Sequence, residues 1–76
     1  MDRAGHGNMC QIAAAATDRL RRTAYPAIRS ILCEYADGVL FLRGRLPDYY
    51  HKQVAQEAVL GLPGVVQVVN QTEVST

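Results

Sequence analysis

The most regular pattern of apolar and polar residues lies in the middle of the chain. Residues 39–46 place leucines at 40, 42 and 46 on one side of an extended backbone. Asp37 and Gly38 precede this run, and the dipeptide is typical of a hairpin turn because both residues tolerate a positive φ. Another alternating run, Ile28–Tyr35, ends just before the turn. The pattern therefore predicts an antiparallel hairpin whose second strand presents leucines to the core.

Segments with helical periodicity flank the hairpin on both sides. Cys10–Ala24 contains four consecutive alanines and an apolar stripe at spacings of three and four, and Tyr25-Pro26 is expected to end the helix. A second helix is predicted after Asp48, a suitable N-cap, and it should end at Gly61. A third strand is predicted at Val65–Val74.

The order of these elements is α-β-β-α-β. A strand–helix–strand crossover is normally right-handed, so both helices should cover one face of the sheet. The predicted fold class is α+β, a two-layer α/β sandwich with a three-stranded mixed sheet. We favour the sheet order 1-2-3 with the last two strands parallel, and an antiparallel 2-1-3 order remains open. Residues 1–9 are predicted to be a flexible tail, and 10–76 a single domain.

Charge and composition exclude several classes of protein. The 76 residues carry a net charge of +1, so no global field attracts nucleic acid. No apolar run is long enough to span a bilayer, and no signal peptide is evident. We therefore expect a cytoplasmic location, or the envelope if a leader was removed. Cys10 and Cys33 are too few for a disulfide scaffold, so both are expected to be reduced.

The sequence offers little catalytic or metal chemistry. His6, Cys10, Cys33 and His51 lack the paired spacing of zinc ligands. Cys33 alternates with apolar residues, which favours a packing role over that of a nucleophile, and no serine elbow or phosphate-binding loop is present. We predict no enzyme activity, metal or cofactor. A metal or thiol enzyme would require bound zinc or a Cys33 that reacts quickly.

The string Gly61–Gly64 matches the GxxG pattern of KH domains, which clamp nucleic-acid backbones with such a loop. Here the string lies between a helix and a strand and contains no Lys or Arg. A helix end followed by a tight turn explains it better.

Two surfaces are candidates for binding. The basic cluster Arg19, Arg21, Arg22 and Arg29 is either a solvated helix end or a site for anionic groups. The outer face of the sheet, which the helices leave open, is predicted to carry apolar side chains suited to self-association or protein binding. Its predicted interface residues are Leu32, Val39, Phe41, Arg43 and Val69, with Ile28 as a further candidate.

Two segments resemble the BON domain family (bacterial OsmY and nodulation). They are D-G-V-L-F-L-R-G at 37–44 and G-L-P-G-V-V-Q-V-V-N at 61–70. The resemblance covers about Ala16 to Val74, and Thr72 departs from it where an apolar residue is usual. The positions that match the family pattern are Gly38, Leu42, Gly44, Gly64, Val65, Val68 and Asn70.

The resemblance implies an α-β-β-α-β fold and a module that binds phospholipid surfaces, small ligands or proteins without catalysis. We accordingly expect a bacterial binding module that contacts anionic phospholipid headgroups or a protein partner, or self-associates through its outer sheet face. The alternative is a small KH-like domain that binds single-stranded nucleic acid.

Overall fold

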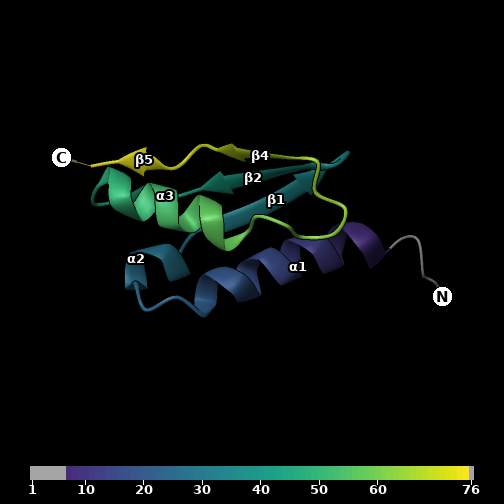
Figure 1. Cartoon of the computed structure of the whole chain (residues 1–76), viewed down its shortest axis with the longest axis horizontal. Coiled ribbons are helices and arrows are strands. Elements are labelled where there is room, and N and C mark those ends of the chain that lie inside the picture. Colours follow the sequence, from purple (N-terminus) through teal and green to yellow (C-terminus); the bar gives the residue numbers. More distant parts are fainter. Residues whose placement is uncertain (1–6, 76) are drawn as a thin grey trace.

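The computed structural model describes the backbone of residues 7–75 and the side chains of residues 11–75. Three helices lie on one side of the strands (Figure 1). The described elements are α1 (Gly7–Arg21), α2 (Pro26–Arg29), β1 (Leu32–Ala36), β2 (Val39–Arg43), β3 (Arg45–Leu46), α3 (Tyr49–Ala58), β4 (Gln67–Asn70) and β5 (Glu73–Val74).

The main sheet has the order β1-β2-β4, with β1 antiparallel to β2 and β2 parallel to β4. This confirms the favoured order and excludes the 2-1-3 alternative. Asp37 and Gly38 form the hairpin turn with φ of +50° and +82°, as their residue types predict. The mixed α+β architecture with helices on one face is therefore the predicted one.

Each of the last two predicted strands is interrupted. Gly44 separates β2 from β3, and Gln71 and Thr72 separate β4 from β5. The pairing nevertheless continues, because the N–H groups of Gln71 and Glu73 donate to the carbonyls of Leu42 and Gly44, both at 2.8 Å. The parallel pairs β2–β4 and β3–β5 are thus successive parts of one continuous strand pairing.

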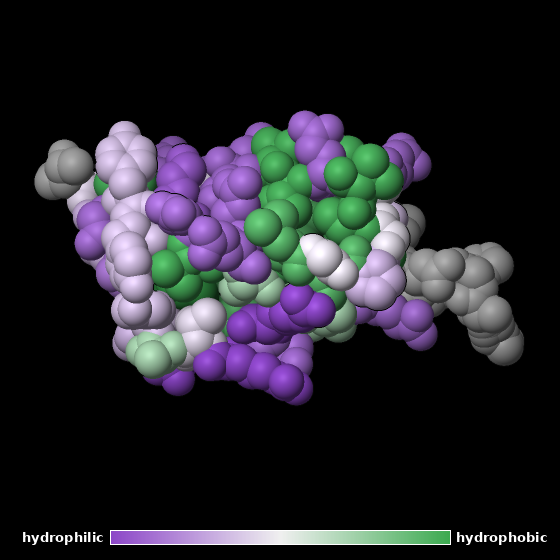
Figure 2. All heavy atoms as spheres, in the orientation of Figure 1, coloured by the Kyte–Doolittle hydropathy of each residue, from purple (hydrophilic) through white to green (hydrophobic). Residues whose placement is uncertain are grey.

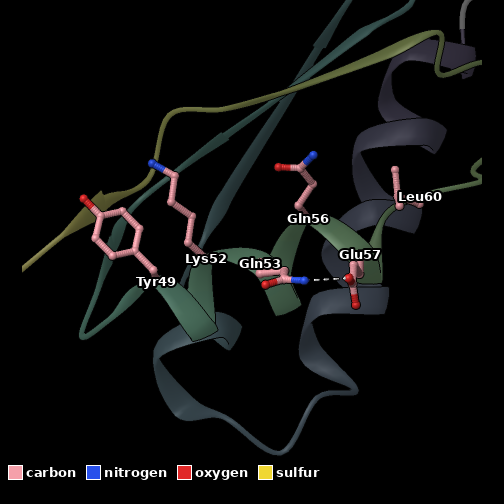
Figure 3. Close-up of a pocket in the computed structure, with 6 residues that line it drawn as sticks. All are labelled: Tyr49, Lys52, Gln53, Gln56, Glu57 and Leu60. Carbon is pink, nitrogen blue, oxygen red and sulfur yellow. Dashed lines mark hydrogen bonds between the residues drawn. The ribbon is translucent and has the colours of Figure 1, made fainter.

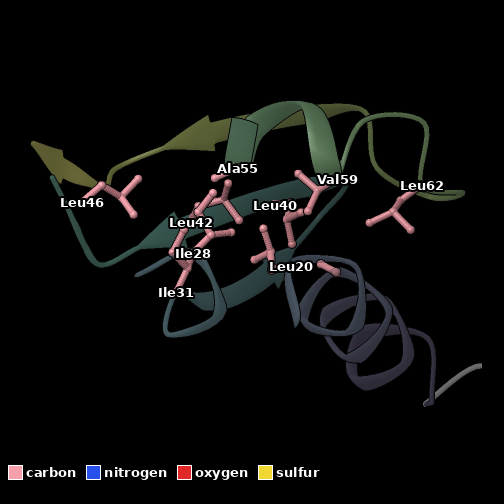
Figure 4. Packing of buried hydrophobic residues seen from close by; sticks show 10 residues of the cluster. Leu20, Ile28, Ile31, Leu40, Leu42, Leu46, Ala55, Val59 and Leu62 are labelled. Carbon is pink, nitrogen blue, oxygen red and sulfur yellow. The ribbon is translucent and has the colours of Figure 1, made fainter. Parts of the chain in front are cut away.

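The core lies between the sheet and the helices (Figure 4). Leu40, Leu42 and Leu46 are fully buried, as their alternation predicts. The other buried apolar residues come mainly from the helices and their ends: Ala16, Leu20, Ile28, Ile31, Ala55, Val59 and Leu62.

The first predicted helix and strand have different boundaries in the structure. The helix predicted at Cys10–Ala24 spans Gly7–Arg21, so Tyr25-Pro26 does not end it. Pro26 instead begins the short helix α2, a position where its missing N–H costs no hydrogen bond. Ile28 is fully buried on α2, so its predicted place on the outer sheet face was wrong.

Helix α3 begins as predicted but ends earlier. The Asp48 carboxylate accepts the His51 N–H at 2.9 Å and caps the helix. The helix ends at Ala58, and Gly61 lies in the following turn with φ of +79°. Its apolar periodicity would place Tyr50 on the buried stripe, but Tyr50 is 59% exposed, and its hydroxyl bonds to that of Tyr25.

Candidate functional site

The outer face of the sheet brings together the five predicted interface residues. Phe41 is in register with Val69 on β4, and Arg43 with Leu32 on β1. Val39 precedes them on β2. Leu32 is 68% exposed, whereas Val39, Phe41 and Val69 are partly buried by their neighbours. The result is an apolar row of Val39, Phe41 and Val69 on β2 and β4 that no helix covers. Leu32 on β1 lies diagonal to Phe41, because Glu34 is the residue directly opposite Phe41.

Charged side chains border this row and pair with one another. The Arg43 guanidinium lies 3.3 Å from the Glu34 carboxylate, and its Nε donates to Gln71 Oε1 at 3.1 Å. Arg45 lies 3.7 Å from Glu73. The charges around the apolar row are therefore balanced within one molecule.

The basic cluster predicted at the end of α1 is only partly available. Arg19 Nη1 donates to the carbonyls of Ala58 (3.4 Å) and Leu60 (3.1 Å), where its charge complements the C-terminal end of α3. Arg22 forms an ion pair of 3.0 Å with Asp18.

Arg21 and Arg29 are exposed at the ends of α1 and α2. Within the described side chains, neither forms an ion pair. Among the described side chains, Arg21 and Arg29 thus differ from Arg19 and Arg22, which have partners.

Sequence reasoning missed a groove of about 490 Å³ on α3 (Figure 3). Tyr49, Lys52 and Gln56 line it from α3, and Leu60 lines it from the turn after the helix. Gln53 and Glu57 form the rim, where Gln53 Nε2 donates to Glu57 Oε2 at 3.2 Å. The spacing of these residues by three and four marks one helix face, which is the signal that could have revealed the groove.

The exposed Leu60 continues this groove into the connection between α3 and β4. Leu60 is 52% exposed, and Val66 on the same connection is 88% exposed. Figure 2 shows hydrophobic surface gathered over this end of the molecule. The α3 side of the domain is therefore also partly apolar.

A cluster of aromatic and polar side chains surrounds the N-terminus of α3. His51 Nδ1 lies 2.7 Å from Asp48 Oδ1, and the His51 ring packs edge-on against Tyr25 with centroids 4.8 Å apart. The hydrogen bonds from the His51 backbone and ring lower the pKa of the Asp48 carboxyl. The hydroxyls of Tyr25 and Tyr50 lie 3.2 Å apart, and this hydrogen bond raises the pKa of Tyr25.

Cys33 is a free, half-buried thiol packed against the core. Burial raises its pKa, and a hydrogen bond with Thr17 acts in the opposite direction. A raised pKa keeps the thiol protonated near neutral pH, which suits packing and not catalysis. His6 and Cys10, the other candidate ligands, lie outside the described side chains.

In residues 11–75, no three His, Cys, Asp or Glu side chains gather into a metal-binding group. In the described part of the chain, no helix has the length and apolar character needed to cross a bilayer.

The Gly61–Gly64 loop has a packing role. Gly64 has a φ of +87°, which residues with a side chain rarely adopt, and a Cβ there would stand 2.7 Å from the tip of the Ile12 side chain, so glycine is favoured. The Tyr35 hydroxyl donates to the Gly64 carbonyl at 2.6 Å. These contacts explain the GxxG string without nucleic acid.

The family model described as BON domain matches residues 11–76. No curated protein matches the chain. The match includes every described element except the first turn of α1, so it covers the outer sheet face, the basic helix end and the groove alike.

Proposed function

The chain belongs to the BON domain family, and from this premise we propose that it self-associates through its outer sheet face. BON domains are in general non-catalytic modules that bind phospholipid or protein. The observation that carries the proposal is the apolar row of Val39, Phe41 and Val69 on the uncovered face, with the exposed Leu32 diagonal to Phe41 on β1.

Apolar contact supplies the driving force for this association. Leu32 is 68% exposed, and Phe41 stands beside Val69 in the centre of the row. Removing such groups from water is favourable by about 25 cal/mol per Å² of apolar surface. A second copy offers the same row, so the contact buries apolar groups on both sides at once.

The charges around the row favour a second copy over a strongly charged partner. Arg43 is paired with Glu34, and Arg45 with Glu73. Because each guanidinium has a carboxylate partner within its own molecule, two copies can face each other without net repulsion. The surface that the two copies would bury is that of one small sheet, so the expected dimer is weak.

Sedimentation equilibrium over a wide concentration range tests the proposal. We expect a monomer–dimer equilibrium that Leu32→Gln weakens by at least about tenfold, since burying a leucine contributes roughly 1.5–3 kcal/mol. Leu60→Gln is the matched control, because Leu60 is similarly exposed but lies beyond the far end of α3. A wild-type chain that stays monomeric at millimolar concentration would refute the proposal.

A second candidate function is binding of anionic phospholipid headgroups at the ends of α1 and α2. It is favoured by Arg21 and Arg29, whose side chains are exposed and form no ion pair with the described carboxylates. Each basic group near an anionic surface contributes about 1 kcal/mol, so two give only weak binding.

Pelleting with phosphatidylglycerol vesicles tests this second function. The double variant Arg21→Gln/Arg29→Gln should lose the bound fraction, whereas Arg43→Gln on the outer sheet face should keep it. Arg19 is left unchanged because it holds the end of α3. Equal pelleting of both variants, or none by the wild type at physiological salt, would exclude the site.

A further inference from the structure

The strand β4 has an open edge. The N–H groups of Gln71, Glu73 and Ser75 donate to the carbonyls of Leu42, Gly44 and Leu46, each at 2.8 Å. Alternate residues of a strand direct their backbone groups to opposite sides. The backbone groups of Val68, Asn70 and Thr72 therefore point away from β2, off the sheet.

Part of this edge is closed by side chains. Lys52 Nζ donates to the Thr72 carbonyl at 2.7 Å, and the Thr72 N–H donates to Asn70 Oδ1 at 3.3 Å. The backbone N–H and C=O groups of Val68 and Asn70 have no partner within the described residues. Two donors and two acceptors are thus left in a row, which is the pattern that another strand recognises.

The groove on α3 lies beside this edge. Tyr49 and Leu60 stand at its two ends, and Gln56 points toward the strand between them (Figure 3). An added strand on β4 could direct alternate side chains into the 490 Å³ groove.

The groove carries one ammonium and one carboxylate, so its formal charges balance. The Lys52 ammonium is bound to the Thr72 carbonyl, and the Glu57 carboxylate accepts from Gln53. Besides these balanced charges it offers two apolar ends and uncharged amides, which favour a partner with apolar side chains and no net charge.

From these observations we infer that the open edge of β4 binds an extended, uncharged peptide, which adds a strand to the sheet and places apolar side chains against Tyr49 and Leu60. Main-chain hydrogen bonds to Val68 and Asn70 provide the affinity, as in other cases of strand addition. The inference does not depend on the proposed dimer, since the edge and the outer face are different surfaces.

The test begins with selection of random octapeptides, displayed on phage, against the whole chain. The best sequence is synthesised and titrated against Val68→Pro and Val68→Ala. Proline removes only the outward N–H and is tolerated at a sheet edge, and alanine is the matched control for the lost side-chain packing. We expect Val68→Pro to bind at least tenfold more weakly than Val68→Ala, a margin of about 1.4 kcal/mol.

Amide hydrogen exchange of the wild-type chain decides the matter if Val68→Pro does not fold. The peptide should protect the amides of Val68 and Asn70 and leave those of Cys33 and Tyr35, at the opposite edge, unchanged. Failure to select any peptide, equal affinities of the two variants, or protection only at Cys33 and Tyr35 would overturn the inference. Protection of Val68 that rises with chain concentration alone would assign the edge to a second copy instead.

Discussion

The ammonium of Lys52 donates a hydrogen bond to the main-chain carbonyl of Thr72 at 2.7 Å, and this bond holds α3 against the strand where β4 gives way to β5. Asn70 Nδ2 returns a bond to the Lys52 carbonyl at 3.0 Å. The two contacts fix the helix relative to the open edge and occupy the backbone of the buried Thr72.

Lys52→Met should therefore destabilise the domain, because methionine keeps most of the apolar stem but leaves the Thr72 carbonyl unpaired. A hydrogen bond to a charged group contributes about 1.5–3 kcal/mol, and Lys52 is partly exposed, so we expect a loss near the lower end. Urea unfolding measures it. Gln56→Met, on the same helix and exposed, is the control; equal stability of both variants would show that the bond contributes nothing.

Replacing a leucine by alanine should have very different effects on stability at the inner and the outer face of the sheet. Leu42→Ala, at a fully buried position, should cost about 2–5 kcal/mol because it leaves a cavity. Leu32→Ala, at a 68% exposed position on β1, should change stability by no more than about 0.5 kcal/mol. Thermal unfolding compares the two; similar losses would mean that the inner and outer faces are assigned wrongly.

The lowered pKa of Asp48 predicts that the stability of the fold decreases at acid pH. Its pKa lies below the ordinary value of 3.8, chiefly because the carboxylate accepts the His51 backbone N–H. A lowered folded-state pKa stabilises the fold above the unfolded pKa, and this stabilisation is lost as the pH falls below about 4 through the folded value. Asp48→Asn keeps a capping oxygen but does not titrate, so its stability should decline less between pH 5 and pH 2. If the stability of the wild type and of Asp48→Asn declined equally with falling pH, Asp48 would not be the source of this dependence.

Cys33 should react slowly in the folded chain. Burial raises its pKa, so little thiolate forms near neutral pH. Alkylation with iodoacetamide at pH 7, read by mass spectrometry, should modify Cys33 much more slowly in the folded chain than in the chain unfolded by urea. Cys10 in the same molecule is resolved by peptide mapping. Fast native-state modification of Cys33 would reopen the question of a reactive thiol.

Local patterns in the sequence were sufficient for much of the fold. The spacing of Leu40, Leu42 and Leu46 gave the buried face, and Asp37-Gly38 gave the turn. Asp48 marked the start of α3. Each of these features depends on residues close together in the chain, which is why periodicity and turn chemistry predicted them.

The features that were missed depend on contacts between distant parts of the chain or on very short elements. Helix α2 has four residues, too few to show a helical period, so Ile28 was read as part of a strand. Arg19 was counted as free because its partners at Ala58 and Leu60 follow about 40 residues later. The groove also required α3 and β4 to be placed side by side, which no local pattern predicts.

The central claim, that two copies meet through their outer sheet faces, is tested most directly by intermolecular nuclear Overhauser effects. The sample mixes isotope-labelled and unlabelled chains at a concentration where the dimer forms. The account predicts contacts from the Phe41 ring of one copy to methyl groups of Leu32 or Val69 in the other. Intermolecular contacts that arise only from α1 or α3, with none from Phe41, would contradict it.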